Sequence, residues 1–201
     1  EPLIFVEVAL VDGLAGNDTI DGLTGDDTLT GGSGNDTIEG GFGLDTAVYT
    51  GALADYLFTA TGSSLVVTDT NTLDGDDGTD TLHFIEALQF SDGILGVAGT
   101  ALTGNAGNNT ISIGAGITSV NGGTGVNALK LDDSGVSVSI LNIQTLTAGT
   151  GADTITLIGS VGDLTPLVST LSAADTLINQ VTLSAVNAIN DTINATFTNE
   201  G

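Results

Sequence analysis

Four aspartates recur at intervals of nine residues near the start of the chain: Asp18, Asp27, Asp36 and Asp45. Carboxylates in so regular a phase suit metal binding. Two of them one strand spacing apart would repel each other by roughly 3 kcal/mol at an effective dielectric of 20, and a cation between them turns this repulsion into attraction. Calcium is the best candidate, because it takes about six to eight oxygen ligands at about 2.3–2.6 Å and accepts backbone carbonyls.

The elements that must position these carboxylates are four consecutive nonapeptides, with glycine in the first and fourth places, aspartate in the sixth and an aliphatic residue in the eighth. The first six residues of each unit suit a tight turn, and the last three form a minimal strand with one inward side chain. Such short strands are stable only when successive turns stack in parallel, about 4.8 Å apart. Two nonapeptides would make one coil, which places Asp18 over Asp36 and Asp27 over Asp45. The units are 13–21, 22–30, 31–39 and 40–48.

The unit Gly31-Gly-Ser-Gly-Asn-Asp-Thr-Ile-Glu39 resembles the calcium-binding nonapeptide of the RTX (repeats-in-toxin, hemolysin-type) family. The first two units depart from the family pattern by Leu14 and Leu23 in the second glycine place, and the fourth has Leu44 in the fifth place and Ala47 in the eighth. The resemblance implies a parallel β-roll, folding that depends on calcium, and secretion to the cell exterior through a type I system.

The resemblance also implies a set of metal ligands. Asp18, Asp27, Asp36 and Asp45 would supply carboxylates, and the turns around Gly32, Gly34, Gly41 and Gly43 would supply carbonyl oxygens. Asp26, next to Asp27 in the second unit, is a further candidate metal residue. The other candidates lie beyond the four units: Asp76, Asp77, Asp80 and Asp153.

The composition is strongly acidic, with 25 acidic residues, one lysine, one histidine, no arginine and a formal net charge of −24. Nucleic acid is excluded as a partner, because a phosphate backbone needs a basic face. There is no cysteine and no apolar run of about 18 residues that could span a membrane. Adaptation to high salt is an alternative cause of the acidity, but the aspartates lie in phase rather than scattered, which favours metal binding.

These patterns predict an all-β chain in four parts: a parallel RTX-type β-roll, a β-rich non-repeat segment and a second, degenerate β-solenoid, preceded by an apolar strand. That first strand would either cap the open end of the roll or pair with a neighbouring subunit. The predicted boundaries are 1–12 for the strand, 13–48 for the calcium-binding roll, 49–100 for the β-rich segment and 101–201 for the second solenoid.

Within 49–100, the residues from Tyr56 to Thr68 predict a β-hairpin, and 75–83 is a degraded repeat. Six of the eight aromatic residues lie in 42–90, so we expect the best-packed core there. Asp76, Asp77 and Asp80 form either an additional calcium site or a solvated loop. We expect His83 to be a packed or surface histidine rather than a ligand.

In the second solenoid, asparagine replaces the aspartate of two repeat-like units. Asn109 and Asn127 are one coil apart and could bond between rungs without metal, since an amide offers both an acceptor and a donor. Asp153 restores the aspartate in a later unit. Residues 167–189 could be helical or extended.

Catalysis is not expected. There is no cysteine, the single histidine is not accompanied by a serine constellation, and the single lysine sits in a repeat. We therefore predict a non-catalytic, calcium-binding structural module of an extracellular bacterial protein: part of an S-layer, an adhesin or a self-assembling filament. Its expected partners are further copies, joined head to tail or by strand pairing, or other surface components. The alternative is the carboxy-terminal export and folding module of a type I-secreted enzyme or toxin.

Overall fold

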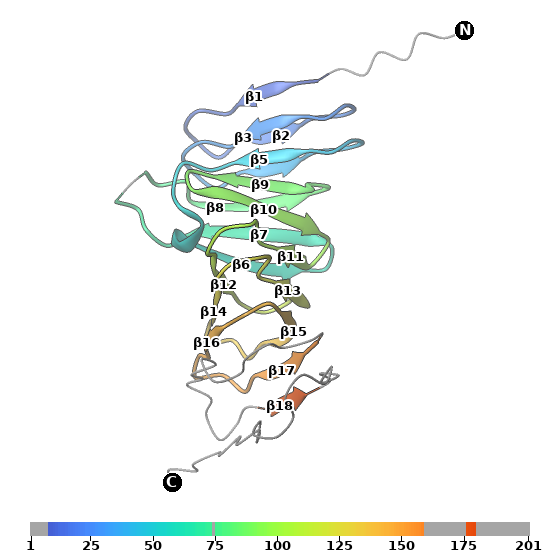
Figure 1. The fold of residues 1–201 in the computed structure, drawn as a ribbon. Coiled ribbons are helices and arrows are strands. Elements are labelled where there is room, and N and C mark those ends of the chain that lie inside the picture. Colours follow the sequence, from blue (N-terminus) through green and yellow to red (C-terminus); the bar gives the residue numbers. More distant parts are fainter. Residues whose placement is uncertain (1–7, 74, 159–175, 180–201) are drawn as a thin grey trace, which may run out of the picture.

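The computed structural model describes residues 8–73, 75–158 and 176–179, and these form an elongated all-β stack of coils (Figure 1). Two sheets run along the stack, and the chain passes repeatedly from one to the other. The larger sheet contains, in spatial order, β1 (Leu10–Asp12), β3 (Thr28–Thr30), β5 (Thr46–Val48), β9 (Ala87–Phe90), β10 (Gly93–Ala98), β11 (Ala101–Thr103), β13 (Ser119–Asn121), β15 (Ser137–Leu141), β17 (Thr154–Leu157) and β18 (Thr176–Asn179). The predicted all-β solenoid is confirmed.

The smaller sheet faces the first across the core, and a single 3₁₀ turn, η1 (Leu53–Asp55), precedes its central hairpin. In spatial order this sheet contains β16 (Thr145–Thr147), β14 (Ala128–Leu131), β12 (Thr110–Ile113), β6 (Tyr56–Thr61), β7 (Ser64–Asp69), β8 (Thr79–His83), β4 (Thr37–Glu39) and β2 (Thr19–Asp21).

The nonapeptides form coils of two units each, as their phase predicts. Strand β2 pairs in parallel with β4, with Ile20 opposite Ile38, and β3 pairs in parallel with β5, with Leu29 opposite Ala47. Each three-residue strand buries its central aliphatic side chain between the two sheets. The core of these coils is therefore thin, with one inward side chain from each strand.

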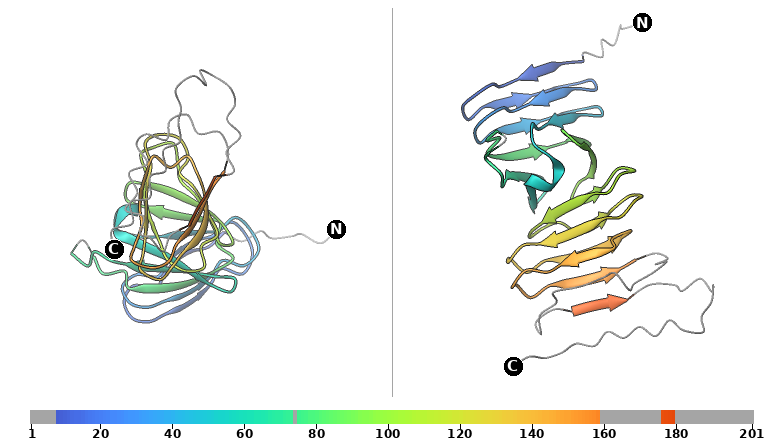
Figure 2. Two further views of the ribbon diagram at one scale, coloured as in Figure 1. Left: turned by 90° about the horizontal axis from the view of Figure 1, so that it is seen from below. Right: turned by 60° about the vertical axis from the view of Figure 1, so that its left-hand side comes forward.

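Antiparallel strands interrupt the stack after β5. Strands β6 and β7 form the predicted hairpin, and β8 is antiparallel to β7 but parallel to β4, so the hairpin is inserted into a continuous sheet. In the other sheet β10 is antiparallel to both β9 and β11. The second solenoid thus continues the same two sheets beyond this junction (Figure 2).

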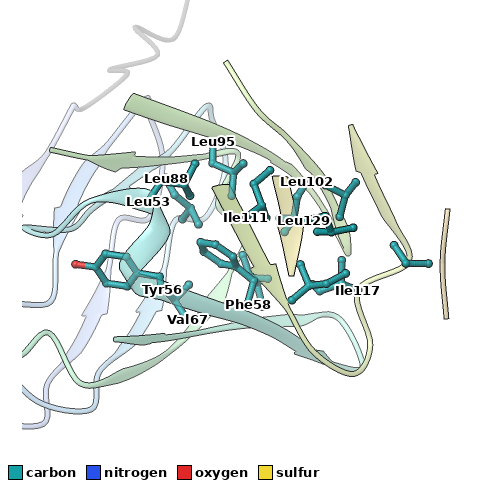
Figure 3. Close-up of a cluster of buried hydrophobic side chains, with 14 of the residues drawn as sticks. Leu53, Tyr56, Phe58, Val67, Leu88, Leu95, Leu102, Ile111, Ile117 and Leu129 are labelled. Carbon is teal, nitrogen blue, oxygen red and sulfur yellow. The ribbon is translucent and has the colours of Figure 1, made fainter. Parts of the chain in front are cut away.

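Aromatic side chains fill the core at the junction. The Tyr49 and Phe90 rings stack with centroids 5.5 Å apart, and Tyr56 lies 4.9 Å from Phe90. Phe58 contacts the same ring edge-on and is fully buried beside Leu95 and Ile111 (Figure 3). The aromatic core expected here is confirmed, although Phe42 and Phe84 are exposed.

Beyond the junction the coils are parallel again. Strand β12 pairs with β14, β13 with β15, and β15 with β17. Strand β18 pairs in parallel with β17. The rest of 167–189 lies outside the described residues.

At the opposite end, β1 pairs in parallel with β3, so Leu10–Asp12 begins the stack as an outer strand. The first seven residues of the predicted apolar strand lie outside the described residues. No helix in the described part of the chain is long and apolar enough to cross a membrane.

Candidate metal centre

The buried aspartates form two columns that tie successive coils together. The backbone N–H of Asp18 donates to Asp36 Oδ1 at 2.7 Å, and that of Asp27 donates to Asp45 Oδ1 at 2.8 Å. The N–H of Ala9 donates to Asp27 Oδ1 at 2.6 Å, so the second column extends toward the first strand. One oxygen each of Asp27, Asp36 and Asp45 is thereby satisfied by the coil before it, as the predicted stacking requires.

Each column ends on an acidic residue beyond the four nonapeptides. The N–H of Asp36 donates to Asp80 Oδ1 at 2.8 Å, and that of Asp45 donates to Glu86 Oε2 at 2.9 Å. The degraded repeat pointed to Asp80, but sequence reasoning missed Glu86. The available signal was its position directly before Ala87, since an aspartate directly precedes β3 and β5 in the same sheet.

The second oxygen of each of these aspartates is the feature that points to a metal. The Oδ2 atoms of Asp18, Asp27, Asp36 and Asp45 are buried and have no hydrogen-bond partner in the structure. Burying a carboxylate oxygen without a partner carries a large desolvation penalty. Such an atom needs either a proton or a cation beside it.

Backbone carbonyls face the same places. A methyl group on Gly13 would lie 2.9 Å from Asp18 Oδ2 and 2.5 Å from the carbonyl oxygen of Gly31 in the next coil. On Gly22, it would lie 2.6 Å from both Asp27 Oδ2 and the Gly40 carbonyl oxygen. Carboxylate and carbonyl oxygens therefore converge with no donor between them. This is the hard, oxygen-only environment that calcium prefers, so the residues present fit this ion.

The electrostatics of the columns also favour a cation. Burial raises the pKa of Asp45, and the nearby charges of Asp27 and Glu86 raise it further, although the Asp27 N–H acts in the opposite direction. Burial is likewise the main cause that raises the pKa of Asp80 to about 7, with the charges of Asp36 and Asp77 adding to it. Like charges in a dry column destabilise it, and a divalent ion would offset that cost.

The four glycines predicted to supply carbonyls lie in the turns and allow the coils to approach closely. A methyl group on Gly34 would lie 2.0 Å from the Gly16 carbonyl oxygen, and one on Gly43 would lie 1.8 Å from that of Gly25. Gly32 and Gly41 stand in the same way over the carbonyls of the preceding coil, and all four have positive φ. Their side of each turn consequently presents only backbone.

The other candidate residues occupy separate places. Asp26 is exposed, and its Oδ1 accepts the N–H of Leu44 at 2.9 Å as part of a surface ladder. Asp153 is buried, and its Oδ1 accepts the N–H of Val136 at 2.7 Å.

Asp76, Asp77 and Asp80 do not gather as one group of three in the described residues. Asp76 is exposed at a turn, whereas Asp77 is buried and accepts hydrogen bonds from the Tyr56 hydroxyl at 2.5 Å and from the Thr50 N–H at 3.0 Å. Asp77 therefore anchors the loop to the aromatic core. In the described residues no three histidine, cysteine, aspartate or glutamate side chains gather where they could hold a metal.

One serine lies beside His83, a neighbour that the sequence separation of the two residues did not reveal. Ser64 Oγ lies 3.3 Å from His83 Nδ1 and 3.5 Å from Nε2, because β7 and β8 are neighbours. The hydroxyl is therefore placed against the side of the ring rather than in line with one nitrogen. His83 and Glu86 both line a cleft of about 440 Å³. The Glu86 carboxylate accepts the Asp45 N–H.

The family comparison agrees with this geometry. The family model of the RTX calcium-binding nonapeptide repeat (4 copies) matches residues 12–47 and 101–120. No curated protein matches the chain. Among solved structures, the extracellular lipase LipA from Serratia marcescens is similar at 17% identity and a TM-score of 0.37, over 89% of this chain and 32% of the lipase chain. This chain spans about a third of the length of that lipase. Residues 12–47 and 101–120 thus match the RTX calcium-binding nonapeptide repeat, and the amino-terminal match is folded as a β-roll.

Proposed function

We propose that this chain is a non-catalytic structural module of an extracellular bacterial protein, and that calcium controls its folding. The observation that carries the proposal is the row of buried Oδ2 atoms without hydrogen-bond partners in Asp18, Asp27, Asp36 and Asp45. Calcium between the coils would bind these oxygens together with the turn carbonyls. Since such a site needs two stacked coils, it does not exist in the unfolded chain, and the free energy of binding becomes free energy of folding.

An extracellular location follows from the same chemistry. RTX repeats are typical of proteins secreted by type I systems, and the stacked carboxylates of 13–48 would keep these coils unfolded where calcium is scarce. Calcium-rich medium would then drive folding outside the cell. The calcium affinity expected for extracellular modules, with Kd of about 10⁻⁴–10⁻³ M, suits this role.

We assign the acidic residues to structure rather than to catalysis. The buried carboxylates of Asp36, Asp45 and Asp80 accept backbone N–H groups of the neighbouring coil. The carboxylate of Asp77 accepts the Tyr56 hydroxyl and so anchors its loop. In the part of the chain that the structure describes, no carboxylate orients the His83 ring beside Ser64, and a nucleophilic serine would need one in addition.

We propose that the end of the stack formed by β1 and β2 mediates self-association. In the described residues nothing pairs with the outer edge of β1 or β2, and Leu10 is 83% exposed on β1. Unpaired edge strands favour pairing with a further chain. Head-to-tail addition of coils would give a filament or a surface layer.

The experiment for calcium control is circular dichroism of the whole chain in chelator and after addition of calcium or magnesium. We expect a gain of β signal with calcium that an equal concentration of magnesium does not match, because magnesium demands a tighter octahedron. A spectrum that is the same in chelator and in calcium would refute the proposal. A catalytic domain encoded beside this segment in the full gene would favour the export-module alternative.

Self-association has its own test in light scattering of calcium-loaded protein. Leu10→Lys places a charge on the outer strand and should abolish higher oligomers. Phe42→Lys is the matched control, since Phe42 is also exposed (82%) but lies between β4 and β5, bridged to Thr24, rather than on the outer strand. Equal loss of assembly in both variants, or a monomeric parent protein, would argue against stacking through this edge.

A further inference from the structure

The family match includes residues 101–120. The buried polar residue of that repeat, in the place of the aspartate, is Asn109, and Asn127 follows one coil later. Their backbone bonds repeat the aspartate columns. The Asn109 N–H donates to Asn127 Oδ1 at 2.9 Å, and the Asn127 N–H donates to Gln144 Oε1 at 2.7 Å. One side-chain oxygen of each residue therefore has the same role in both halves of the stack.

The second side-chain atom also occupies the same place but has the opposite character. A methyl group on Gly104 would lie 2.9 Å from Asn109 Nδ2 and 2.5 Å from the Gly122 carbonyl oxygen. These are the distances found around Gly13 for Asp18 Oδ2 and the Gly31 carbonyl. Where the aspartate coils present an oxygen to the carbonyls, the asparagine coils present an N–H donor.

That donor is surrounded by oxygens. Asn109 Nδ2 lies 2.8 Å from the Gly107 carbonyl oxygen, 3.0 Å from that of Gly122 and 3.1 Å from Asn127 Oδ1. Asn127 Nδ2 likewise donates to the Asn142 carbonyl at 3.0 Å. The amide nitrogen thus satisfies carbonyls of two successive coils, as a bridging cation would.

We infer that the units 104–112 and 122–130 bind no calcium, because the side-chain amides of Asn109 and Asn127 take the place of the ion. This deepens the proposed function and rests on it for the comparison with the aspartate coils. The consequence is a chain with two kinds of coil: those of 13–48 close on calcium, whereas those of the asparagine units close without it.

The larger apolar core of the second kind supports this inference. The aspartate coil of 13–30 buries two aliphatic side chains, Ile20 and Leu29. The coil that contains Asn109 buries Ile111, Ile113, Ile117 and Val120. With its carbonyls satisfied by amide donors and with more apolar area removed from water, this coil has no unmet need for a metal.

Hydrogen exchange of the whole chain in chelator tests the inference directly. We expect the amides of β12 and β14 to exchange at least about 100-fold more slowly than those of β2 and β4. Loss of protection in β12 and β14 on chelation, with recovery on addition of calcium, would overturn the inference. Failure of the proposed function gives a different result, in which β2 and β4 also stay protected without calcium.

Calorimetric calcium titration of variants provides a second test. Asn109→Asp replaces the donor by an oxygen and should raise the number of bound calcium ions by one relative to the parent chain. Asn108→Asp is the matched control, because Asn108 is the exposed neighbour and its Oδ1 only accepts the Val126 N–H. An unchanged calcium number in Asn109→Asp, or an equal gain in both variants, would overturn the inference.

Discussion

The coils before and after the aromatic junction follow one backbone plan but are closed by different interactions. In the coil of 13–30, the inward side chains are Ile20 and Leu29, and buried carboxylate oxygens face carbonyls. In the coil that contains Asn109, four aliphatic side chains are buried and amide donors face the carbonyls. The exchange of one atom, oxygen for nitrogen, decides whether the same turn needs a cation.

The magnitudes show why each arrangement is sufficient. Each fully buried aliphatic side chain contributes about 1.5–3 kcal/mol, so two more in a coil contribute about 3–6 kcal/mol. The repulsion between two stacked carboxylates is roughly 3 kcal/mol at an effective dielectric of 20. A larger core or a bound cation can therefore each offset the weakness of a three-residue rung.

The junction gives the aspartate coils a preformed surface on which to stack. Asp80 is the second residue of β8, and Glu86 directly precedes β9. Their carboxylates accept the N–H groups of Asp36 and Asp45. The acidic columns therefore end on the part of the chain that holds the aromatic core. Loss of calcium should unravel the coils as far as this surface.

Calcium removal should have the largest effect and is the most direct way to break the comparison. We expect chelator to abolish part of the far-ultraviolet β signal, while near-ultraviolet circular dichroism from Tyr49 and Tyr56 persists, because both tyrosines belong to the junction core. Simultaneous loss of both signals would mean that the two regions fold as one unit and would contradict their independence.

The second prediction compares the cavities that a leucine-to-alanine substitution creates in each kind of coil. Leu29 and Leu129 are both fully buried, and replacing either by alanine should cost about 2–5 kcal/mol when its coil is folded. Leu129→Ala should lower stability equally with and without calcium. Leu29→Ala should do so only with calcium, since its coil is unfolded in chelator. Urea unfolding of both variants in the two conditions measures this, and a calcium-independent cost for Leu29→Ala would go against the prediction.

The nine-residue phase was enough to predict the roll because it carries register information. A period of two units places Asp18 beside Asp36 and Ile20 beside Ile38, as the structure shows. The turn glycines could be predicted for the same reason, since stacked turns leave no room for a side chain. The position of the hairpin followed from the apolar runs on either side of Gly62.

Contacts across the insertion could not be predicted in this way. Asp36 and Asp80 are 44 residues apart and Asp45 and Glu86 are 41 apart, so no repeat period relates them. The burial of Asp77 depends on where the inserted loop meets Tyr56, which is a tertiary contact without a local signal.

The third prediction tests how closely the turns stack. Gly34→Ala should cost about 1–3 kcal/mol, because its methyl group would meet the Gly16 carbonyl oxygen at 2.0 Å. Gly62→Ala is the control: it also has positive φ, but nothing lies within 4 Å of its methyl position, so only backbone strain of about 1 kcal/mol remains. Thermal unfolding in saturating calcium gives both values, and equal losses would show that steric stacking is not decisive.

The smallest expected effect concerns a leucine in place of the second glycine of the first unit. Leu14 has φ of 73° and is exposed, so it bears the left-handed cost of about 1–2 kcal/mol without gaining burial. Leu14→Gly removes this strain but adds backbone entropy to the unfolded chain, worth about 0.5–1 kcal/mol. We expect a net stabilisation of less than about 1 kcal/mol in calcium.

Leu44→Gly is the matched control, because Leu44 is equally exposed but is not among the residues with positive φ, and it should destabilise instead. Urea titrations in which both variants shift in the same direction would contradict the assignment of strain to Leu14. Opposite shifts would locate the strain at Leu14, a cost that the first coil bears although it buries only Ile20 and Leu29.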